Sequence, residues 1–235
     1  MHRKDFFNII FEDSDIIAVN KASGISIGGD RYDETKERLD KLLEKELNIK
    51  IFTVHRIDKD TSGLVIFAKN KEIHKELSMA FENRKIEKKY IAIVHGRPSW
   101  KETVCDLALV PNGNKKHMTI IDKFRGKKSL TKFIHLHSAG NYSVLEAIPE
   151  TGRIHQIRVH SAAIGHPVVC DELYGKINPV KLSSFKRGWK GDPYEEKPLL
   201  SRLGLHALEI KLPNGKILEA PLAKDMKALI NQLKK

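Results

Sequence analysis

Short apolar runs between turn residues recur along the chain, and they predict β-strands. Two such runs within residues 6–20, separated by an acidic turn, are typical of a β-hairpin. Further strands are predicted over residues 64–68, 90–94 and 143–148, and just before the turn at residues 213–215. The run at 64–68 has no polar member, which is expected of a strand that is buried on both faces.

Four other segments have apolar residues at helical spacing. They span residues 34–47, 73–81, 154–164 and 225–233. The first is rich in charges, which predicts an amphipathic surface helix. The third should bury Ile154, Ile157, Ser161 and Ile164 on one face and end at Gly165.

Charge narrows the class of partner. Lys and Arg number 42 against 30 Asp and Glu in 235 residues, a formal charge of +12, with 40% hydrophobic and 31% charged residues. This composition describes a globular protein, and the basic excess favours a polyanion such as RNA. No apolar run approaches the roughly 20 residues of a membrane span, and acidic residues interrupt the N-terminal apolar stretch. We therefore expect a cytoplasmic protein without a membrane partner.

The most concentrated charge lies in the loop before the strand at 64–68. His55, Arg56, Asp58 and Lys59 precede Thr61-Ser62-Gly63. A carboxylate there is fixed to a buried strand, as catalysis requires. Asp58 would otherwise be an ordinary turn residue or helix cap, and Gly63 the corner at which the strand begins.

The order His-Arg-Ile-Asp, two residues, Thr-Ser-Gly resembles the signature loop of the RluA family of RNA pseudouridine synthases. The resemblance implies that Asp58 is the catalytic residue. Lys21 to Gly24 is similar to the family's Lys-Pro-x-Gly turn, with Ala22 in place of proline. Residues 149–175 resemble a second family motif over nearly their whole length, with Ser161 and Cys170 where leucine and glycine are more usual.

The resemblance also implies partners for Asp58. Arg158 would form a salt bridge with it, Tyr90 of the Lys88-x-Tyr90 motif would support the base, and Leu205 or Leu203 would line the pocket. An arginine fork can hold both carboxylate oxygens, and its charge favours an ionised Asp58 acting as nucleophile or general base. Further substrate or RNA contacts are expected from the following residues: His55, Arg56, Lys88, Arg153 and Leu205.

Pseudouridine formation needs no cofactor, and we expect neither cofactor nor metal. His155 and His160 are five residues apart, off the i, i+4 spacing of a helical metal pair. Cys105 and Cys170 lack a C-x-x-C partner, which favours reduced thiols. The rival interpretation is a non-catalytic RNA-binding protein of the same fold, because charge and aromatic residues serve binding equally well.

The family's fold is α+β: a largely antiparallel mixed β-sheet in two halves, with flanking helices and a central active-site cleft. We expect residues 1–235 to form one such catalytic domain, without a separate N-terminal RNA-binding module, acting as a monomer on ribosomal or transfer RNA. The basic loops at residues 111–128 and 176–198 would either grip RNA phosphates or merely remain solvated.

Overall fold

The computed structural model describes residues 6–29, 37–114 and 118–234. The chain forms two compact units: unit 1 comprises Met1–Lys88 and His206–Leu222, and unit 2 comprises Lys89–Leu205 and Ala223–Lys235. Unit 1 is therefore assembled from two segments that unit 2 separates in the sequence.

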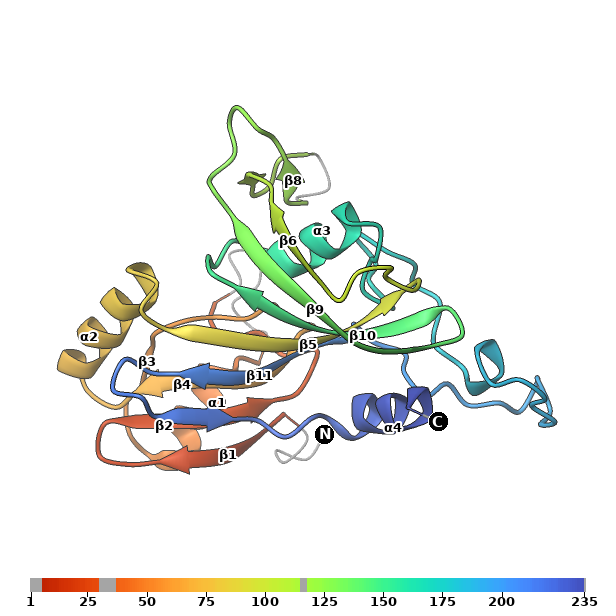
Figure 1. Ribbon diagram of the computed structural model, residues 1–235. Coiled ribbons are helices and arrows are strands. Elements are labelled where there is room, and N and C mark those ends of the chain that lie inside the picture. The colour runs from red at the N-terminus through yellow and green to blue at the C-terminus, as the bar shows by residue number, and fades with distance from the viewer. Residues whose placement is uncertain (1–5, 30–36, 115–117, 235) are drawn as a thin grey trace. The chain divides into compact units, whose positions relative to one another are not determined.

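Unit 1 is a mixed sheet with two helices (Figure 1). Its elements are β1 (Phe7–Glu12), β2 (Ile16–Lys21), α1 (Leu39–Leu47), β3 (Phe52–Thr53), β4 (Ser62–Ala68), α2 (Lys71–Glu82), β11 (Leu205–Lys211, from His206 on) and β12 (Ile217–Glu219). The strand order is β1-β2-β4-β11, with β12 beside β11 and β3 beside β4. Only the β4–β11 pair is parallel among these described pairs.

Strand β4 is the centre of unit 1, and all seven of its residues are buried. On one side it pairs with β2 along most of its length. On the other side, β11 pairs with Ser62 and Gly63 and β3 pairs with Phe67 and Ala68. Gly63 has φ +112°, and a Cβ there would lie 2.2 Å from the carbonyl oxygen of Ala207. Only glycine allows this close approach of the two strands.

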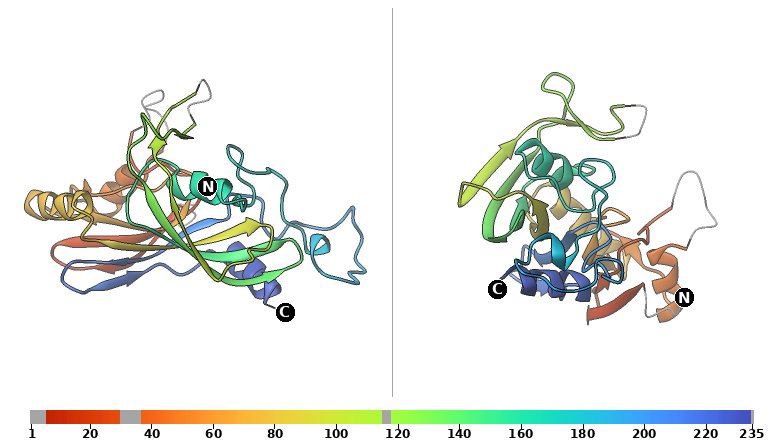
Figure 2. Two further views of the ribbon diagram at one scale, coloured as in Figure 1. Left: turned by 45° about the horizontal axis from the view of Figure 1, so that its top comes forward. Right: turned by 90° about the vertical axis from the view of Figure 1, so that its right-hand side faces the viewer.

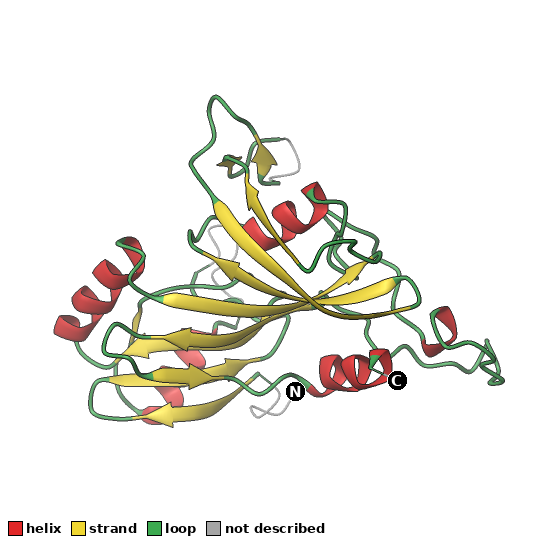
Figure 3. Cartoon of the chain, in the orientation of Figure 1, coloured by secondary structure: helices red, strands yellow, loops and turns green. Residues whose placement is uncertain are grey.

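Unit 2 is built on four antiparallel strands in the order β5-β10-β9-β6. Its elements are β5 (Glu87–His95, from Lys89 on), β6 (Glu102–Asp106), β7 (Leu109–Val110), β8 (Ile120–Ile121), β9 (Leu130–Ala139), β10 (Tyr142–Pro149), α3 (Gln156–Ala163), a 3₁₀ turn (Leu182–Ser184) and α4 (Lys224–Leu233). Strands β7 and β8 form a small hairpin of their own. Figure 3 shows residues 176–198 as loop apart from the 3₁₀ turn.

Two helices contact β9 and β10, with α3 above and α4 below these strands in the view of Figure 1. Helix α4 buries Met226, Leu229, Ile230 and Leu233 as predicted. Helix α3 differs from the prediction. It begins at Gln156, so Ile154 lies outside it and is 47% exposed, and its residues 156–161 are buried on every side.

The predicted α+β class with largely antiparallel strands is confirmed, and each predicted strand and helix is found. Helix α1 begins at Leu39; of its predicted first turn, residues 34–36 lie outside the described residues, whereas Glu37 and Arg38 precede the helix. Strands β6 and β9 were not foreseen. Among the described helices, none has the length and apolar content that a membrane crossing would require. That residues 1–235 act as one catalytic domain stays a prediction.

Candidate functional site

Asp58 lies in a tight loop that leads directly into β4. Its side chain is half-buried between the buried Ile57 and the exposed Lys59. Its carbonyl oxygen accepts a hydrogen bond from the backbone N–H of Thr61 at 3.2 Å. Ser62, which is buried, bonds the ring of His206 at 2.9 Å and so fastens the end of the loop to β11. The loop is thus fixed at its exit by the sheet.

A buried lysine fastens the same loop from β2. Lys21 is 1% exposed, and its ammonium group donates to the carbonyl oxygens of Ala22, Ile25 and Lys59 at 2.8–2.9 Å. The Lys59 carbonyl also accepts from Gly24 N–H at 2.9 Å. Lys21 therefore ties the turn after β2 to the residue next to Asp58, which limits where the carboxylate can lie.

His55 joins the loop to the edge of β4. Its Nε2 accepts a hydrogen bond from Ile66 N–H at 2.9 Å. Ile66 lies on the same edge of β4 as the residues that pair with β11 and β3, in the stretch between the two pairings. Its ring stacks on Phe81 of α2, with centroids 4.5 Å apart. Burial, together with the charge of Lys88, lowers the pKa of His55 to about 3. A neutral ring agrees with Nε2 acting as an acceptor. These contacts give His55 a positioning role.

Arg56 and Lys88 are the two cations of unit 1 that we expect to contact RNA. Arg56 is exposed. Lys88 is half-buried, and burial lowers its pKa to about 8. An ammonium group that is partly removed from water interacts more strongly with an anion than a fully hydrated one does.

In unit 2, Arg158 lies in the first turn of α3 and is 5% exposed. Its Nε and Nη2 donate to the two carboxylate oxygens of Asp171, each at 2.8 Å, which is a bidentate ion pair. Burial would raise the pKa of Asp171, but the hydrogen bonds and charge of Arg158 lower it below the ordinary value of 3.8. Asp171 thus holds Arg158 in one orientation.

Tyr174 completes this cluster. The guanidinium carbon of Arg158 lies 5.2 Å from the centre of the Tyr174 ring, within range of a cation–π interaction. The Tyr174 hydroxyl accepts from Thr119 N–H at 2.8 Å and contacts Nδ1 of His155 at 2.9 Å. His155 therefore serves this network and is not placed as a metal ligand.

Gln156 orders the segment that carries Arg153. Its Oε1 accepts from Thr151 Oγ at 2.7 Å and from Arg153 N–H at 3.0 Å, and its Nε2 donates to Leu130 O and Thr131 Oγ at 2.9 Å. Arg153 itself is half-buried, and its Nε donates to the carbonyl of Lys128 at 3.4 Å.

Three of the expected apolar or aromatic residues share one cluster in unit 2. Leu203 and Leu205 are buried in it, and Tyr90 packs partly buried against it. Tyr90 pairs with Ala147 of β10, and Ile157, the neighbour of Arg158, belongs to the same cluster. Unit 2 thus brings the start of α3, the start of β5 and the start of β11 to one core.

Comparison with known proteins gives the same family. A model of RNA pseudouridylate synthases matches residues 15–163. The ribosomal large subunit pseudouridine synthase C of Buchnera aphidicola is 34% identical over 99% of this chain and 73% of its own length. The dual-specificity RNA pseudouridine synthase RluA of Vibrio vulnificus is 35% identical over 88% of this chain and 78% of its own length.

The chain belongs to the RluA family of RNA pseudouridine synthases. A solved structure supports the fold: human RNA pseudouridylate synthase domain containing 4 has a TM-score of 0.73 at 22% identity, covering 97% of this chain and 93% of the human chain. The resemblance read from the two sequence motifs is thereby confirmed at the level of the family.

The sequence located the family motifs but missed two partners within them. Asp171 lies in the second motif, yet nothing in its spacing assigned it to Arg158. Lys21 was matched to a family position without a role, because a buried lysine bonded to carbonyl groups leaves no trace in a hydropathy pattern. Cys170 has φ +55°, in the left-handed region, which explains why glycine is more usual in this family at that position.

The remaining candidates for other chemistry have structural roles. Cys105 and Cys170 are buried free thiols, as expected. His160 bonds Thr131 Oγ at 2.9 Å and the Leu107 carbonyl at 3.0 Å, inside unit 2. Within the described ranges, no three His, Cys, Asp or Glu side chains are grouped so that they could hold a metal ion.

Proposed function

We propose that this member of the family isomerises uridine to pseudouridine in ribosomal or transfer RNA, with Asp58 as the catalytic carboxylate. The observation that carries the proposal is the matched family motif at residues 55–63, in a loop that Lys21, His55 and Ser62 fix to the sheet of unit 1. Binding alone does not require a carboxylate held in this way.

The reaction needs few groups. The bond from uracil N1 to the ribose breaks, the base turns, and C5 forms the new bond; the proton leaves C5 and a proton is gained at N1. The uridine must first leave its stack and enter the protein. Asp58 then acts as nucleophile or general base on the nucleoside. Proton transfer by a positioned group contributes about 10²- to 10⁴-fold to such reactions.

Arg158, Tyr90 and Leu205 are proposed to act on the same uridine. Arg158 has five N–H donors and holds Asp171 through Nε and Nη2; we propose that its guanidinium also pairs with the carboxylate of Asp58. Tyr90 would support the uracil ring by stacking, and Leu205 would form an apolar wall. Arg56, Lys88 and Arg153 would contact RNA phosphates, and residues 1–235 would work as one catalytic domain.

The name of one relative supports ribosomal RNA as a substrate, because it names the ribosomal large subunit; the other is named a dual-specificity RNA pseudouridine synthase, which agrees with more than one RNA substrate. We further propose that the protein acts as a monomer in the cytoplasm, where these RNAs are found. Mapping pseudouridine in both RNA classes, from cells with and without the gene, would identify the site.

Tritium release tests the activity directly. RNA labelled with [5-³H]uridine loses its tritium only when C5 forms the new bond, so released tritium counts turnovers. Incubation of purified protein with labelled ribosomal and transfer RNA should release tritium without any added metal or cofactor. Binding of these RNAs without tritium release would instead favour the non-catalytic RNA-binding protein.

A further inference from the structure

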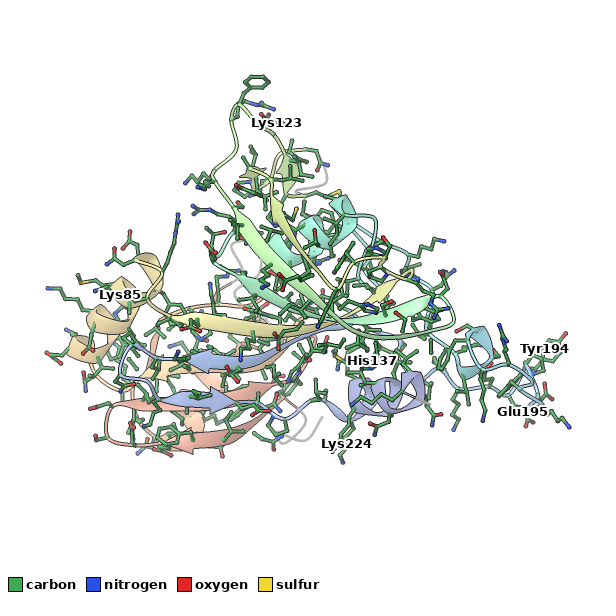
Figure 4. All side chains as sticks on the ribbon, in the orientation of Figure 1. Lys85, Lys123, His137, Tyr194, Glu195 and Lys224 are labelled. Carbon is green, nitrogen blue, oxygen red and sulfur yellow. The ribbon has the colours of Figure 1, made fainter. Side chains whose placement is uncertain are left out.

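The segment between β8 and β9 carries an aromatic side chain that is almost fully exposed. Phe124 is 98% exposed, and its exposed neighbours Lys123, Arg125, Lys127 and Lys128 are all cations. We call residues 122–128 the basic tip. Figure 4 shows Lys123 at the outermost end of this segment, which projects away from the strands of unit 2. The proposed reaction assigns no task to Phe124.

The basic tip has a defined backbone because Asp122 collects its hydrogen bonds. The Asp122 carboxylate accepts from the N–H groups of Phe124 and Arg125, each at 2.9 Å, and from Arg125 Nε at 2.7 Å. Its carbonyl accepts from Gly126 N–H at 2.9 Å, where a Cβ would lie only 2.3 Å from that oxygen. Phe124 is therefore presented on a turn whose shape is already set, which lowers the entropy lost on binding.

The basic tip is also attached to the cluster around Arg158. Leu109 and Lys127 exchange two backbone hydrogen bonds of 2.9–3.0 Å, which close the base of the segment. Arg153 donates to the Lys128 carbonyl. Thr119, just before β8, is bonded to the hydroxyl of Tyr174, whose ring meets Arg158. An RNA that contacts Arg158 would therefore contact a region of unit 2 that hydrogen bonds connect to the basic tip.

We propose that Phe124 stacks on an RNA base other than the target uridine while the cations of the basic tip bind the neighbouring phosphates. The inference rests on the proposed function and extends it to a second contact with the same RNA. Every base offers a π-face, and stacking on an aromatic side chain contributes about 1–3 kcal/mol per base. Four exposed cations beside one ring match a polyanion with stacked bases, whereas a single ring offers too little apolar area for a stable protein interface.

The loop at residues 176–198 supplies a matched control. Tyr194 is also 98% exposed, and its N–H likewise bonds the carboxylate of an aspartate two residues earlier, Asp192, at 2.8 Å. Glu195 and Glu196 follow it, so its immediate surroundings are acidic. Figure 4 shows Tyr194 and Glu195 far from Lys123. Tyr194 has the exposure and the turn of Phe124, but its adjacent side chain Glu195 is acidic, and the nearest cation along the sequence is Lys197.

Equilibrium binding to a fluorescein-labelled single-stranded RNA of about 20 nucleotides, long enough for a typical single-strand site, tests the proposal. Phe124→Ala should weaken affinity by roughly 5- to 150-fold, and Phe124→Leu should do the same, because it keeps apolar area but not the ring. Phe124→Trp should bind within a few-fold of wild type, as should Tyr194→Ala. An RNA containing 2-aminopurine should lose fluorescence on binding wild type, Phe124→Trp and Tyr194→Ala, but not on binding Phe124→Ala or Phe124→Leu.

Several results would overturn the proposal. Unchanged affinity in Phe124→Ala, or full affinity in Phe124→Leu, would mean that no base stacks there. Weaker binding of Phe124→Ala to vesicles containing phosphatidylserine, with unchanged RNA affinity, would identify a membrane contact instead. Absence of tritium release from the wild-type protein would refute the proposed function, which is a separate outcome.

Discussion

Lys21 and Arg158 are the two buried cations in the part of the chain that the structure describes, one in each unit, and the partners described above differ in kind. Lys21 donates to three carbonyl oxygens. Arg158 pairs with a carboxylate. The lysine therefore fixes the path of a backbone, whereas the carboxylate fixes the direction of a side chain. Removing the Lys21 hydrogen bonds should therefore mainly affect catalysis, whereas removing the Arg158 ion pair should mainly affect stability.

Lys21 and Arg158 are both proposed to position or bind the Asp58 carboxylate. Loss of that carboxylate should therefore have the largest effect on activity. Asp58→Asn keeps the size of the side chain but removes the negative charge. We expect tritium release to fall by at least about 10²-fold, while RNA affinity stays within a few-fold. The control is Asp60→Asn in the same loop, whose exposed side chain should be dispensable. Turnover retained in Asp58→Asn would refute the assignment.

Asp171→Ala would break the carboxylate partnership of unit 2. It leaves Arg158 buried without this counter-charge, so the free energy of unfolding should fall by about 3–5 kcal/mol in urea titrations. The exposed Asp15 provides the control, because Asp15→Ala should change stability by less than about 0.5 kcal/mol. A loss as small as that of the control would mean that the pair adds nothing.

The same variant should alter acid stability. The folded pKa of Asp171 lies below 3.8, so its contribution is fully present above the unfolded value and is lost as the pH falls through the folded pKa. Stability measured between pH 5 and pH 3 should therefore decline less steeply in Asp171→Ala than in wild type.

Lys21→Met would break the backbone partnership of unit 1. Methionine fills similar space but leaves three carbonyl oxygens without their donor, which should cost about 1–3 kcal/mol of stability. Because the Lys59 carbonyl would be released beside Asp58, kcat should fall by about tenfold or more while KM changes little. Lys41→Met, which loses an exposed ion pair with Glu44, should leave both within error. An unchanged kcat would show that Lys21 does not position the loop.

The charge of Lys88 should have the smallest effect on RNA affinity. Its pH dependence tests whether this partly desolvated cation contacts RNA. Its pKa of about 8 means that charge is lost as the pH rises from 7 to 9. RNA affinity should fall a few-fold over that range in wild type and stay level in Lys88→Arg, which remains charged. Stability should move the other way, rising with pH between about 8 and 10.5, because the unfolded chain binds the proton more tightly.

The sequence predicted most of the fold because its elements follow simple periods. Strand β4 is apolar throughout, and α4 repeats its core face at helical spacing. Strand β9 was not predicted. Its inward positions include the polar Thr131, which bonds Gln156 and His160, while the apolar Leu136 on the same strand is 48% exposed. A polar residue facing inward and an apolar one facing outward erase the alternation.

Residues of the candidate site could be predicted where they belong to a recognisable motif. They could not be predicted where hydrogen bonds between distant residues determine which side chains pair. Asp58 and Arg158 follow from their motifs. The pairing of Arg158 with Asp171 depends on the turn after α3, in which Cys170 adopts a left-handed backbone conformation, and no local pattern reveals this. An RNA contact by His55 stays a prediction, and the structure adds a hydrogen bond from the edge of β4 to its ring, a contact that only the folded sheet defines.

The parallel pairing of β4 with β11 has a consequence for biosynthesis. Residues 62 and 63 form backbone partners with residues 206 and 207, so residue 207 must emerge from the ribosome before the Asp58 loop can be fixed to β11. The intervening segment of unit 2 is synthesised first. A newly made molecule therefore gains its activity only after the residues of β11 have emerged, and a truncated product ending before residue 206 should be inert.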